Sequence, residues 1–470
     1  MSDLKTLRAA FSGALRTSDG DCAPFLIDWR KTWRGTAIGV AQPDSVDDVA
    51  RLVRWCAEHG VRIVPQGGNT GQSGGSVPPA TGRNLVVSLT RLNAVRRIDL
   101  ANNTVTVDAG CVLQSVQALA DAHDRYFPLS LGAQGSCTIG GNLATNAGGS
   151  AVLRYGNMRD LCLGIEVVTA QGDVWNGLKG LRKDNSGYDL RDLFIGSEGT
   201  LGVITGAVLK LFPKPAARVT AFIAVATPAD AMRLFETARA KFDTALTAFE
   251  LMSGACLELV IKHVPGARAP LAERSRWYLL AEFSDPRSED DCRSNLVSWL
   301  ERGLAAGLIS DAVIAESVAQ SAALWSLRES ISPAQASEGK AIKHDIAVPV
   351  SEIAAFIAEG LAAATAQFPG IRPVIFGHLG DGNIHYNFSA QAGADQNAFL
   401  ALAPRLNAMI HDLVRAHGGT ISAEHGLGVL RRDEAHAYRS PVEQRLMAAI
   451  KSALDPHGMM NPEKLLGQTV

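Results

Sequence analysis

The sequence has no excess charge of either sign, no closely paired cysteines and no long apolar run. Its 45 lysines and arginines nearly balance 47 aspartates and glutamates, which gives a formal net charge of −2. Nucleic-acid-binding proteins usually carry a basic face, so we expect no nucleic-acid partner. An acidic substrate would be attracted by a few local cations rather than by the field of the whole protein.

The seven cysteines are scattered, without a Cys-x-x-Cys pair. This pattern is typical of reduced thiols in a cytosolic enzyme, not of a disulfide framework or an iron–sulfur site. No apolar run approaches the roughly 18 residues of a membrane span. The first residues also lack the charged and apolar regions of a signal peptide. We therefore expect no transmembrane segment and a cytoplasmic location.

The length of 470 residues, with an ordinary globular composition, predicts two or three domains. Short strand-like and helical patterns over residues 35–214 predict a mixed α+β domain. Pro213–Pro215 marks a boundary, because two prolines this close disfavour both helix and central strand. Alternating segments over residues 215–429 predict an antiparallel sheet covered by helices on one side. Residues 1–34 form an N-terminal segment, and residues 430–470 a C-terminal helical segment.

Three glycine-rich loops lie within the first predicted domain, at Pro65–Gly75, Gly132–Gly149 and Gly196–Thr205. Because glycine has no Cβ, the backbone N–H groups of such loops can approach phosphate oxygens closely. The first loop therefore predicts a pyrophosphate site. One such loop could equally be a simple turn, but three favour a cofactor site. The Rossmann glycine pattern and the P-loop lysine are both absent from the sequence.

A second cluster of polar residues predicts a metal site. If Ile384–Phe388 is a strand, His385 and Asn387 point to the same face, and His378 can fold toward them across a Gly-Asp-Gly-Asn turn. Together with Glu424, the two imidazoles form a ligand set that suits catalytic zinc with open positions, although Mn²⁺ or Co²⁺ could fit. The open positions would hold the hydroxyl and carboxylate of a substrate.

The order of the three loops and the Pro-Lys-Pro exit resemble the FAD domain of the vanillyl-alcohol oxidase and p-cresol methylhydroxylase (PCMH) superfamily. Leu181–Leu190 and Ser422–Gly426 resemble its D-2-hydroxyacid dehydrogenase branch, most of all the members that act on D-2-hydroxyglutarate. The resemblance extends from about Trp29 to the C-terminus. It implies an α+β fold with a PCMH-type FAD-binding domain of two α+β subdomains. It also implies an antiparallel-sheet substrate domain and a C-terminal helical segment that returns to the FAD domain.

The resemblance implies extended FAD, with its pyrophosphate on residues 67–72 and its ring near residues 135–148 and 198–204. The residues implied to contact FAD are Pro65, Gln66, Gly67, Gly68, Asn69, Thr70, Gly71, Gln72, Gly135, Ser136, Gly140, Gly141, Asn142, Thr145, Gly148, Glu198, Gly202, Val203, Ile204 and Asn461. Relatives with covalent FAD on the first loop use a histidine there. This sequence has Asn69, so we predict non-covalent FAD.

The resemblance also assigns the substrate site. The metal ligands of the family match His378, His385 and Glu424, and its catalytic base matches His425. A histidine near neutral pKa can accept the proton of a metal-bound hydroxyl, while the hydride on C2 passes to flavin N5. Because neighbours in an extended strand face oppositely, the Gly426–Gly428 segment must bend the chain if Glu424 and His425 are to serve one site.

The residues that match the grip on the distal carboxylate of 2-hydroxyglutarate are Arg328, Ser332 and Lys343, and Asn387 and His425 complete the expected substrate contacts. Arg328 and Ser332 lie one turn apart in a segment that reads as helical. Two positions depart from the family pattern. Ser332 stands where threonine is usual, and His344 stands where tyrosine is usual, so we expect a pocket of altered size or polarity.

The resemblance implies an FAD- and metal-dependent dehydrogenase that oxidises D-2-hydroxyglutarate to 2-oxoglutarate. One alternative is a D-lactate or other D-2-hydroxyacid dehydrogenase on the same scaffold. An alternative from another class is a non-catalytic flavin-binding subunit that only passes electrons. The implied electron acceptor is an electron-transfer flavoprotein or a quinone-linked carrier, and we expect a homodimer.

Overall fold

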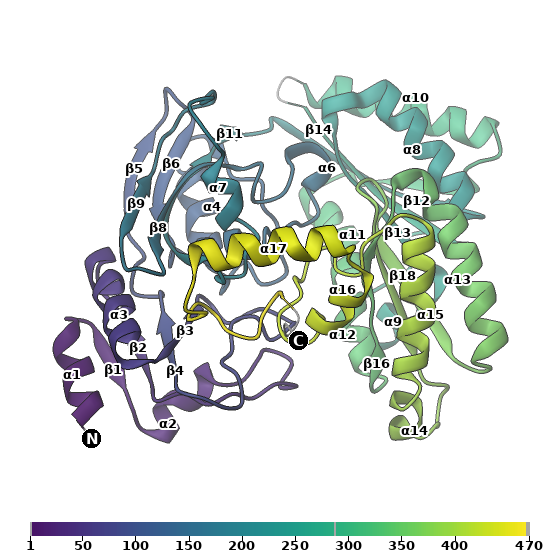
Figure 1. The fold of residues 1–470 in the computed structure, drawn as a ribbon. Coiled ribbons are helices and arrows are strands. Elements are labelled where there is room, and N and C mark those ends of the chain that lie inside the picture. The colour runs from purple at the N-terminus through teal and green to yellow at the C-terminus, as the bar shows by residue number, and fades with distance from the viewer. Residues whose placement is uncertain (1, 286–287, 467–470) are drawn as a thin grey trace. The chain divides into compact units, whose positions relative to one another are not determined.

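The computed structural model describes residues 2–285 and 288–466. By its internal contacts the chain groups into two compact units (Figure 1). Unit 1 comprises residues 1–149, 156–213 and 424–470, and unit 2 comprises residues 150–155 and 214–423. Within the described ranges, the helices include none that is both long and apolar enough to cross a membrane.

The first sheet of unit 1 has the strand order β1(Ala14–Arg16), β2(Gly39–Gln42), β4(Asn84–Ser88), β3(Arg62–Gln66). Strands β2, β4 and β3 are parallel, and β1 is antiparallel to β2. Helix α3(Val46–His59) connects β2 to β3. The side chain of Ser45 caps its start by accepting from the N–H of Asp48, and Gly60, at φ 60°, ends it. The helix therefore begins and ends at residues suited to those positions.

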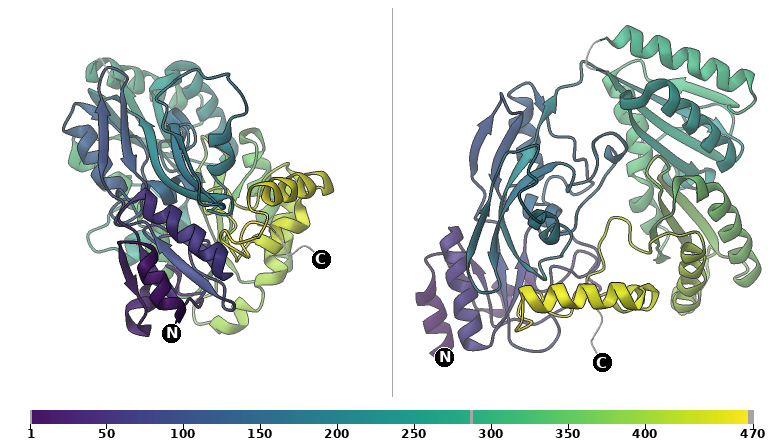
Figure 2. Two further views of the ribbon diagram at one scale, coloured as in Figure 1. Left: turned by 60° about the vertical axis from the view of Figure 1, so that its left-hand side comes forward. Right: turned by 45° about the horizontal axis from the view of Figure 1, so that its top comes forward.

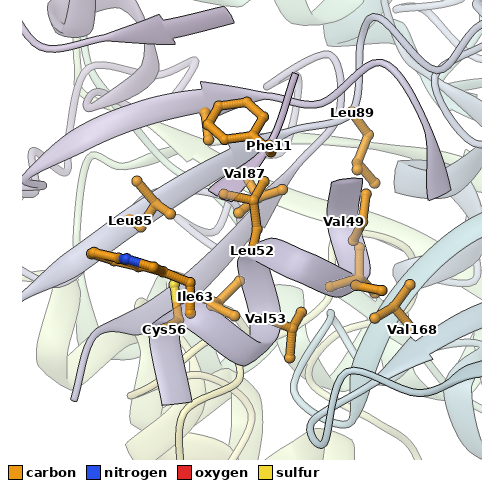
Figure 3. Packing of buried hydrophobic residues seen from close by; sticks show 14 of the residues in the cluster. Phe11, Val49, Leu52, Val53, Cys56, Ile63, Leu85, Val87, Leu89 and Val168 are labelled. Atoms are coloured by element: carbon orange, nitrogen blue, oxygen red, sulfur yellow. The ribbon is translucent and has the colours of Figure 1, made fainter. Parts of the chain in front are cut away.

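The core of unit 1 lies between α3 and its sheet, as Figure 3 shows. The apolar residues of this helix face apolar residues of the strands, and all are buried: Val49, Leu52, Val53, Cys56, Ile63, Leu85 and Val87. Removal of each large aliphatic side chain from water stabilises the fold by roughly 1.5–3 kcal/mol. This core fixes the end of β3, from which the first glycine loop leaves.

The second sheet of unit 1 is antiparallel, in the order β5(Val95–Asp99), β6(Thr104–Asp108), β10(Gly202–Lys210), β8(Cys162–Thr169), β9(Val174–Gly177). Val168 and Val203 extend from it into the same core. The remaining elements of unit 1 are α1(Ser2–Ala10), α2(Asp19–Cys22), α4(Leu113–Asp121), β7(Arg125–Tyr126), α5(Ile139–Ala144), α7(Leu190–Phe194), β11(Phe212–Pro213), α16(Arg432–Tyr438) and α17(Pro441–Leu454).

The C-terminal segment returns to the first sheet. The N–H of Ile63 donates to the carbonyl of Met459 (2.9 Å), and the N–H of Asn461 donates to the carbonyl of Ile63 (2.8 Å). Two α+β subdomains with a returning C-terminal segment confirm this part of the expected fold.

Unit 2 is built on an antiparallel sheet of eight strands, seven of them in the order β15(Asp311–Ile314), β12(Ala217–Val225), β14(Trp277–Asp285), β13(Leu246–Ser253), β18(Arg372–His378), β19(Asn383–Ser389), β16(Ala341–Ile342), with β17(Asp345–Ala347) also on β19. The helices of this unit are α6(Val152–Tyr155), α8(Pro228–Phe242), α9(Gly254–His263), α10(Glu289–Ala305), α11(Val318–Glu329), α12(Ile331–Ala336), α13(Ile353–Gln367), α14(Gln396–Leu400) and α15(Ala403–Ala416). The predicted antiparallel sheet is confirmed.

Helices cover both faces of this sheet, so the expectation of one covered face is wrong (Figures 1 and 2). Phe249 of β13 packs on Phe235 of α8 and Trp299 of α10. On the opposite face, Met252 of β13 belongs to a cluster with residues of α9, α11 and α12. Strand β13 shows why both faces need a cover. Its residues 246–252 are all buried, so the side chains on both faces of the strand are shielded from water.

Candidate active site

The three glycine loops of unit 1 line one pocket. Gly67 and Gly68 bring the first loop against the second. A Cβ on Gly67 would lie 2.2 Å from Oγ1 of Thr138, and one on Gly68 would lie 1.9 Å from the carbonyl oxygen of Ser136. Thr138 lines the pocket, and its buried hydroxyl has no hydrogen-bond partner among the described residues. Close glycine backbone and a free buried hydroxyl fit a bound pyrophosphate-containing cofactor.

Most of the residues expected to contact FAD line this pocket: Pro65, Gln66, Gly67, Gly68, Asn69, Thr70, Gly71, Gly140, Gly141, Asn142, Thr145, Glu198, Gly202 and Ile204. Six do not line it: Gln72, Gly135, Ser136, Gly148, Val203 and Asn461. The side chain of Val203 packs in the core of unit 1. The side chain of Asn461 instead joins two loops, because it donates to the carbonyls of Gly75 (2.8 Å) and Glu198 (2.6 Å).

Asn69 is held rigidly in the first loop. Its backbone is left-handed, at φ 53°. The amide nitrogen donates to the carbonyls of Pro24 (3.2 Å) and Ile27 (2.9 Å), and the amide oxygen accepts from the hydroxyl of Ser76 (2.8 Å). Asparagine tolerates this backbone conformation better than most residues. The residue that replaces the histidine of covalent relatives therefore shapes the loop through its side chain.

Glu198 connects the third glycine loop to the segment that carries His425. Its carboxylate accepts from the N–H groups of Leu427 and Gly428, each at 2.8 Å, and burial raises its pKa. Gly426 and Gly428 have φ values of 69° and 50°. The bend that the sequence requires after His425 is therefore present, and glycine makes it possible.

His425 lines the same pocket and touches two residues of the first glycine loop. Its carbonyl accepts from the hydroxyl of Ser73 (3.0 Å), and its Nε2 lies 3.3 Å from the amide nitrogen of Gln72. Arg30 donates through Nε to the oxygen of that amide at 2.9 Å, which orients the amide nitrogen toward His425. Because the amide nitrogen only donates, Nε2 of His425 is the acceptor in this contact.

The two histidines of the metal prediction lie on the hairpin β18–β19 of unit 2. His378 is the last residue of β18 and His385 is the third residue of β19, and their ring centroids are 5.9 Å apart. Gly382, at φ 92°, turns the chain between them. His385 has Nδ1 at 3.8 Å from the carboxylate of Asp345 on the paired strand β17.

Glu424 follows Ala423, whose N–H donates to the carbonyl of Asp345 (3.1 Å). Glu424 is the first residue of unit 1 after the border with unit 2, and it offers a carboxylate. Two imidazoles and one carboxylate are a donor set that catalytic zinc sites use. The residues present therefore fit a divalent ion of this kind.

Three residues of the predicted carboxylate grip lie on different elements. Arg328 is buried in the last turn of α11, and Ser332 is exposed on α12. The expected single helix is two helices that meet at Ser330. The expected continuous strand is divided into the two short strands β16 and β17, and Lys343 lies between them. Asn387 is buried, and its amide contacts Gln335 and the backbone of His344.

His344 is the second residue that departs from the family pattern. Its ring is buried, with Nδ1 at 2.8 Å from the carbonyl of Tyr386 and Nε2 at 3.0 Å from the side-chain oxygen of Asn407 on α15. The effect of His344 on the size or polarity of the pocket stays a prediction.

Comparison with known proteins identifies the family. Residues 37–177 match FAD binding domains, and residues 214–465 match the C-terminal domain of FAD linked oxidases. The mitochondrial D-2-hydroxyglutarate dehydrogenase of Arabidopsis thaliana is 37% identical over 93% of this chain and 77% of that protein. The D-2-hydroxyglutarate dehydrogenase of Xanthomonas citri pv. viticola is 38% identical over 96% of this chain and 94% of that protein. The chain belongs to the D-2-hydroxyglutarate dehydrogenase family of FAD-linked oxidases.

Two solved structures of other proteins support the fold. Substrate-bound p-cresol methylhydroxylase has a TM-score of 0.74 at 15% identity, with 99% of this chain and 96% of that chain covered. An alkyldihydroxyacetonephosphate synthase has a TM-score of 0.75 at 17% identity, with 98% of this chain and 86% of that chain covered. The expected PCMH-type fold is confirmed, and as a member of the family the chain is an FAD-dependent dehydrogenase.

Membership of the family does not account for Glu250, which the sequence prediction missed. This residue lies in the middle of β13 with 1% of its side chain exposed. Its carboxylate contacts both His378 (2.7 Å) and Arg328 (2.8 Å). Although burial raises the pKa of Glu250, the contacts with His378 and Arg328 outweigh burial and hold that pKa below its usual value. The missed signal was the single charged residue in a strand that is otherwise uncharged.

Proposed function

We propose that this protein oxidises D-2-hydroxyglutarate to 2-oxoglutarate. The observation that carries the proposal is the joint placement, in one unit, of the imidazole pair His378 and His385 with the buried guanidinium of Arg328. An imidazole-held ion suits the hydroxyl and carboxylate of a 2-hydroxyacid, and a planar guanidinium suits a second carboxylate. The identities of 34% to 38% with D-2-hydroxyglutarate dehydrogenases and a related transhydrogenase support this substrate class.

Each group has a defined role in the proposed reaction. FAD, held non-covalently by the glycine loops, supplies the acceptor for the hydride from C2. A zinc ion bound by His378, His385 and Glu424 would make the substrate hydroxyl more acidic. His425 accepts the hydroxyl proton. Arg328, Ser332 and Lys343 bind the distal carboxylate. Asn387 supports the site from the same strand as His385.

Consecutive positions in the chain support a shared site. Glu424 and His425 are joined by one peptide bond, and His425 lines the pocket of the glycine loops. A metal ligand and a proton acceptor that adjoin in this way suit a reaction in which a proton leaves the hydroxyl oxygen and a hydride leaves C2, the carbon that bears that oxygen.

Anaerobic mixing of the purified protein with a panel of D- and L-2-hydroxyacids tests the proposal. We expect the flavin absorbance to bleach with D-2-hydroxyglutarate, not with the L-isomer, and a metal chelator to suppress the bleaching. A larger kcat/KM for D-lactate than for D-2-hydroxyglutarate would make D-lactate the substrate instead. Flavin that stays oxidised with every D-2-hydroxyacid would contradict the proposal and favour a non-catalytic flavin-binding subunit.

Reoxidation of the bleached flavin identifies the acceptor. We expect an electron-transfer flavoprotein or a quinone analogue to restore the absorbance faster than oxygen does. Pyruvate belongs in the same test, because a 34% identical relative from Saccharomyces cerevisiae is a D-2-hydroxyglutarate–pyruvate transhydrogenase. A cytoplasmic location and a homodimer stay predictions, which fractionation and light scattering would check.

A further inference from the structure

One buried carboxylate contacts both ends of the proposed substrate site. Oε1 of Glu250 is 2.7 Å from Nδ1 of His378, and Oε2 of Glu250 accepts from Nε of Arg328 at 2.8 Å. Glu250 is the direct cross-strand neighbour of His378 in the pairing of β13 with β18. Because β13 lies between β14 and β18 inside the sheet, the backbone of Glu250 has little freedom to move.

We propose that Glu250 is a positioning residue that fixes the spacing between His378 and Arg328 and thereby selects the chain length of the substrate. This inference rests on the proposed function, in which His378 belongs to the metal site for the hydroxyacid end and Arg328 binds the distal carboxylate. Both groups are held by the two oxygens of a single carboxylate. Neither can shift toward or away from the other without breaking one of these contacts.

The contact with His378 fixes which ring nitrogen faces the substrate. A carboxylate accepts only, so Nδ1 of His378 must carry the hydrogen in the contact with Glu250. Nε2 is then left with its lone pair for a metal ion. A carboxylate in this position also orients the ring, and loss of such a partner typically weakens metal affinity 10- to 100-fold.

The contact with Arg328 fixes which edge of the guanidinium is free. Nε is used by Glu250, so the Nη groups remain for a substrate carboxylate, which they can bind through two hydrogen bonds. The guanidinium carbon also lies 4.7 Å from the ring centroid of Phe376, which adds a second restraint. Only 10% of the Arg328 side chain is exposed, so few other orientations are open to it.

The variant Glu250→Gln tests this role because glutamine offers one acceptor oxygen where two donors, His378 and Arg328, require two. Zinc affinity is measured by chelator competition. At saturating zinc, kcat/KM is measured for D-malate, D-2-hydroxyglutarate and D-2-hydroxyadipate, which carry four, five and six carbons, and for D-lactate. We expect zinc affinity to fall about 10- to 100-fold. The ratio of kcat/KM for D-2-hydroxyglutarate to kcat/KM for the four- and six-carbon acids should fall about tenfold. The value of kcat/KM for D-lactate should change less.

A second variant and a matched control separate positioning from general damage. Glu250→Asp keeps the charge but is shorter by about 1.5 Å, so it cannot reach both partners and should also lose the chain-length preference. Glu282→Gln is the control, since Glu282 lies on the neighbouring strand β14, accepts from Trp325 (2.9 Å) and interacts with the charge of Arg218. It should leave both zinc affinity and chain-length preference unchanged.

The outcomes distinguish this inference from the proposed function. If the wild-type protein oxidises D-2-hydroxyglutarate and both Glu250 variants keep its zinc affinity and chain-length preference, the positioning role is wrong. A loss of only one of the two properties would also overturn the shared role. If the wild-type protein oxidises none of these acids, the proposed function fails and the chain-length role with it. The zinc measurement would then still decide whether Glu250 orients His378.

Discussion

The amide nitrogen of Gln72 lies 3.3 Å from Nε2 of His425, and Arg30 holds the oxygen of the same amide at 2.9 Å. Sequence reasoning assigned Gln72 to the pyrophosphate of FAD, yet its side chain reaches the predicted base instead. The three residues form a chain in which the guanidinium of Arg30 sets the direction of the Gln72 amide, and the amide nitrogen contacts Nε2 of His425.

The variant Gln72→Leu should therefore lower kcat without releasing FAD. Loss of one hydrogen bond to the base corresponds to about 1.4 kcal/mol, or roughly a tenfold drop in kcat. Arg30→Leu should lower kcat by a similar factor, and the double variant by little more than either. Flavin content is read from absorbance, with the exposed Gln171→Leu as control. If Gln72→Leu instead loses flavin, Gln72 is a cofactor contact.

FAD should leave the protein on acid precipitation, because Asn69 occupies the position where covalent relatives have histidine. The variant Asn69→Ala should bind FAD about tenfold more weakly, since it loses three side-chain hydrogen bonds and leaves alanine at φ 53°. Asn103→Ala is a matched control, because Asn103 has φ 49° in a turn outside the pocket. Flavin-to-protein ratios after dilution check the result, and flavin that stays with the precipitate would contradict non-covalent binding.

The variant His385→Ala should lose bound zinc and turnover together. A metal ion stabilises developing charge by several kcal/mol, so we expect kcat/KM to fall roughly a thousandfold. Elemental analysis by mass spectrometry measures the metal. His263→Ala is the control, because His263 pairs with Glu338 away from the metal residues of unit 2. Full activity in a zinc-free His385 variant would remove this residue from the metal site.

The variant Arg328→Ala should raise KM for D-2-hydroxyglutarate roughly 10- to 100-fold, which corresponds to a loss of about 1.5–3 kcal/mol of binding free energy. The KM for D-lactate should rise less. The reason is that only the longer acid has a second carboxylate for the guanidinium. Arg274→Ala is the control, since Arg274 is exposed and pairs with the exposed Glu258 (2.9 Å). Equal losses on the two acids would show that Arg328 acts through Glu250 and the fold rather than on substrate.

The sequence predicted features that local patterns determine. Glycine content identified the loops of the pocket, and the spacing of His378 and His385 across a turn identified the hairpin. Contacts between distant segments were not predictable in this way. Glu250 is 128 positions from His378, and Gln72 is 353 positions from His425. The first contact depends on the pairing of β13 with β18, and the second on the bend at Gly426 and Gly428. Neither leaves a periodic signal in one sequence.

Glu338 should make the stability of the protein depend on pH. Bonds from His263 and Lys262, with a further contribution from Arg372, lower its pKa from about 4.5 to about 2. A carboxylate with a lowered pKa in the folded state stabilises the fold at neutral pH. That contribution is lost as the pH falls from about 4.5 toward 2.

The variant Glu338→Gln tests this dependence. Since Lys262, His263 and Arg372 around Glu338 are partly exposed, we expect a loss of about 1 kcal/mol at pH 7. Thermal unfolding of wild type and Glu338→Gln is measured between pH 7 and pH 3, and the difference between their Tm values should become smaller as the pH falls. At pH 7, 1 M salt should also make this difference smaller. Glu258→Gln, which removes an exposed pair with Arg274, should show little difference at any pH. A constant gap between wild type and Glu338→Gln across this pH range would mean that packing, and not charge, explains the effect.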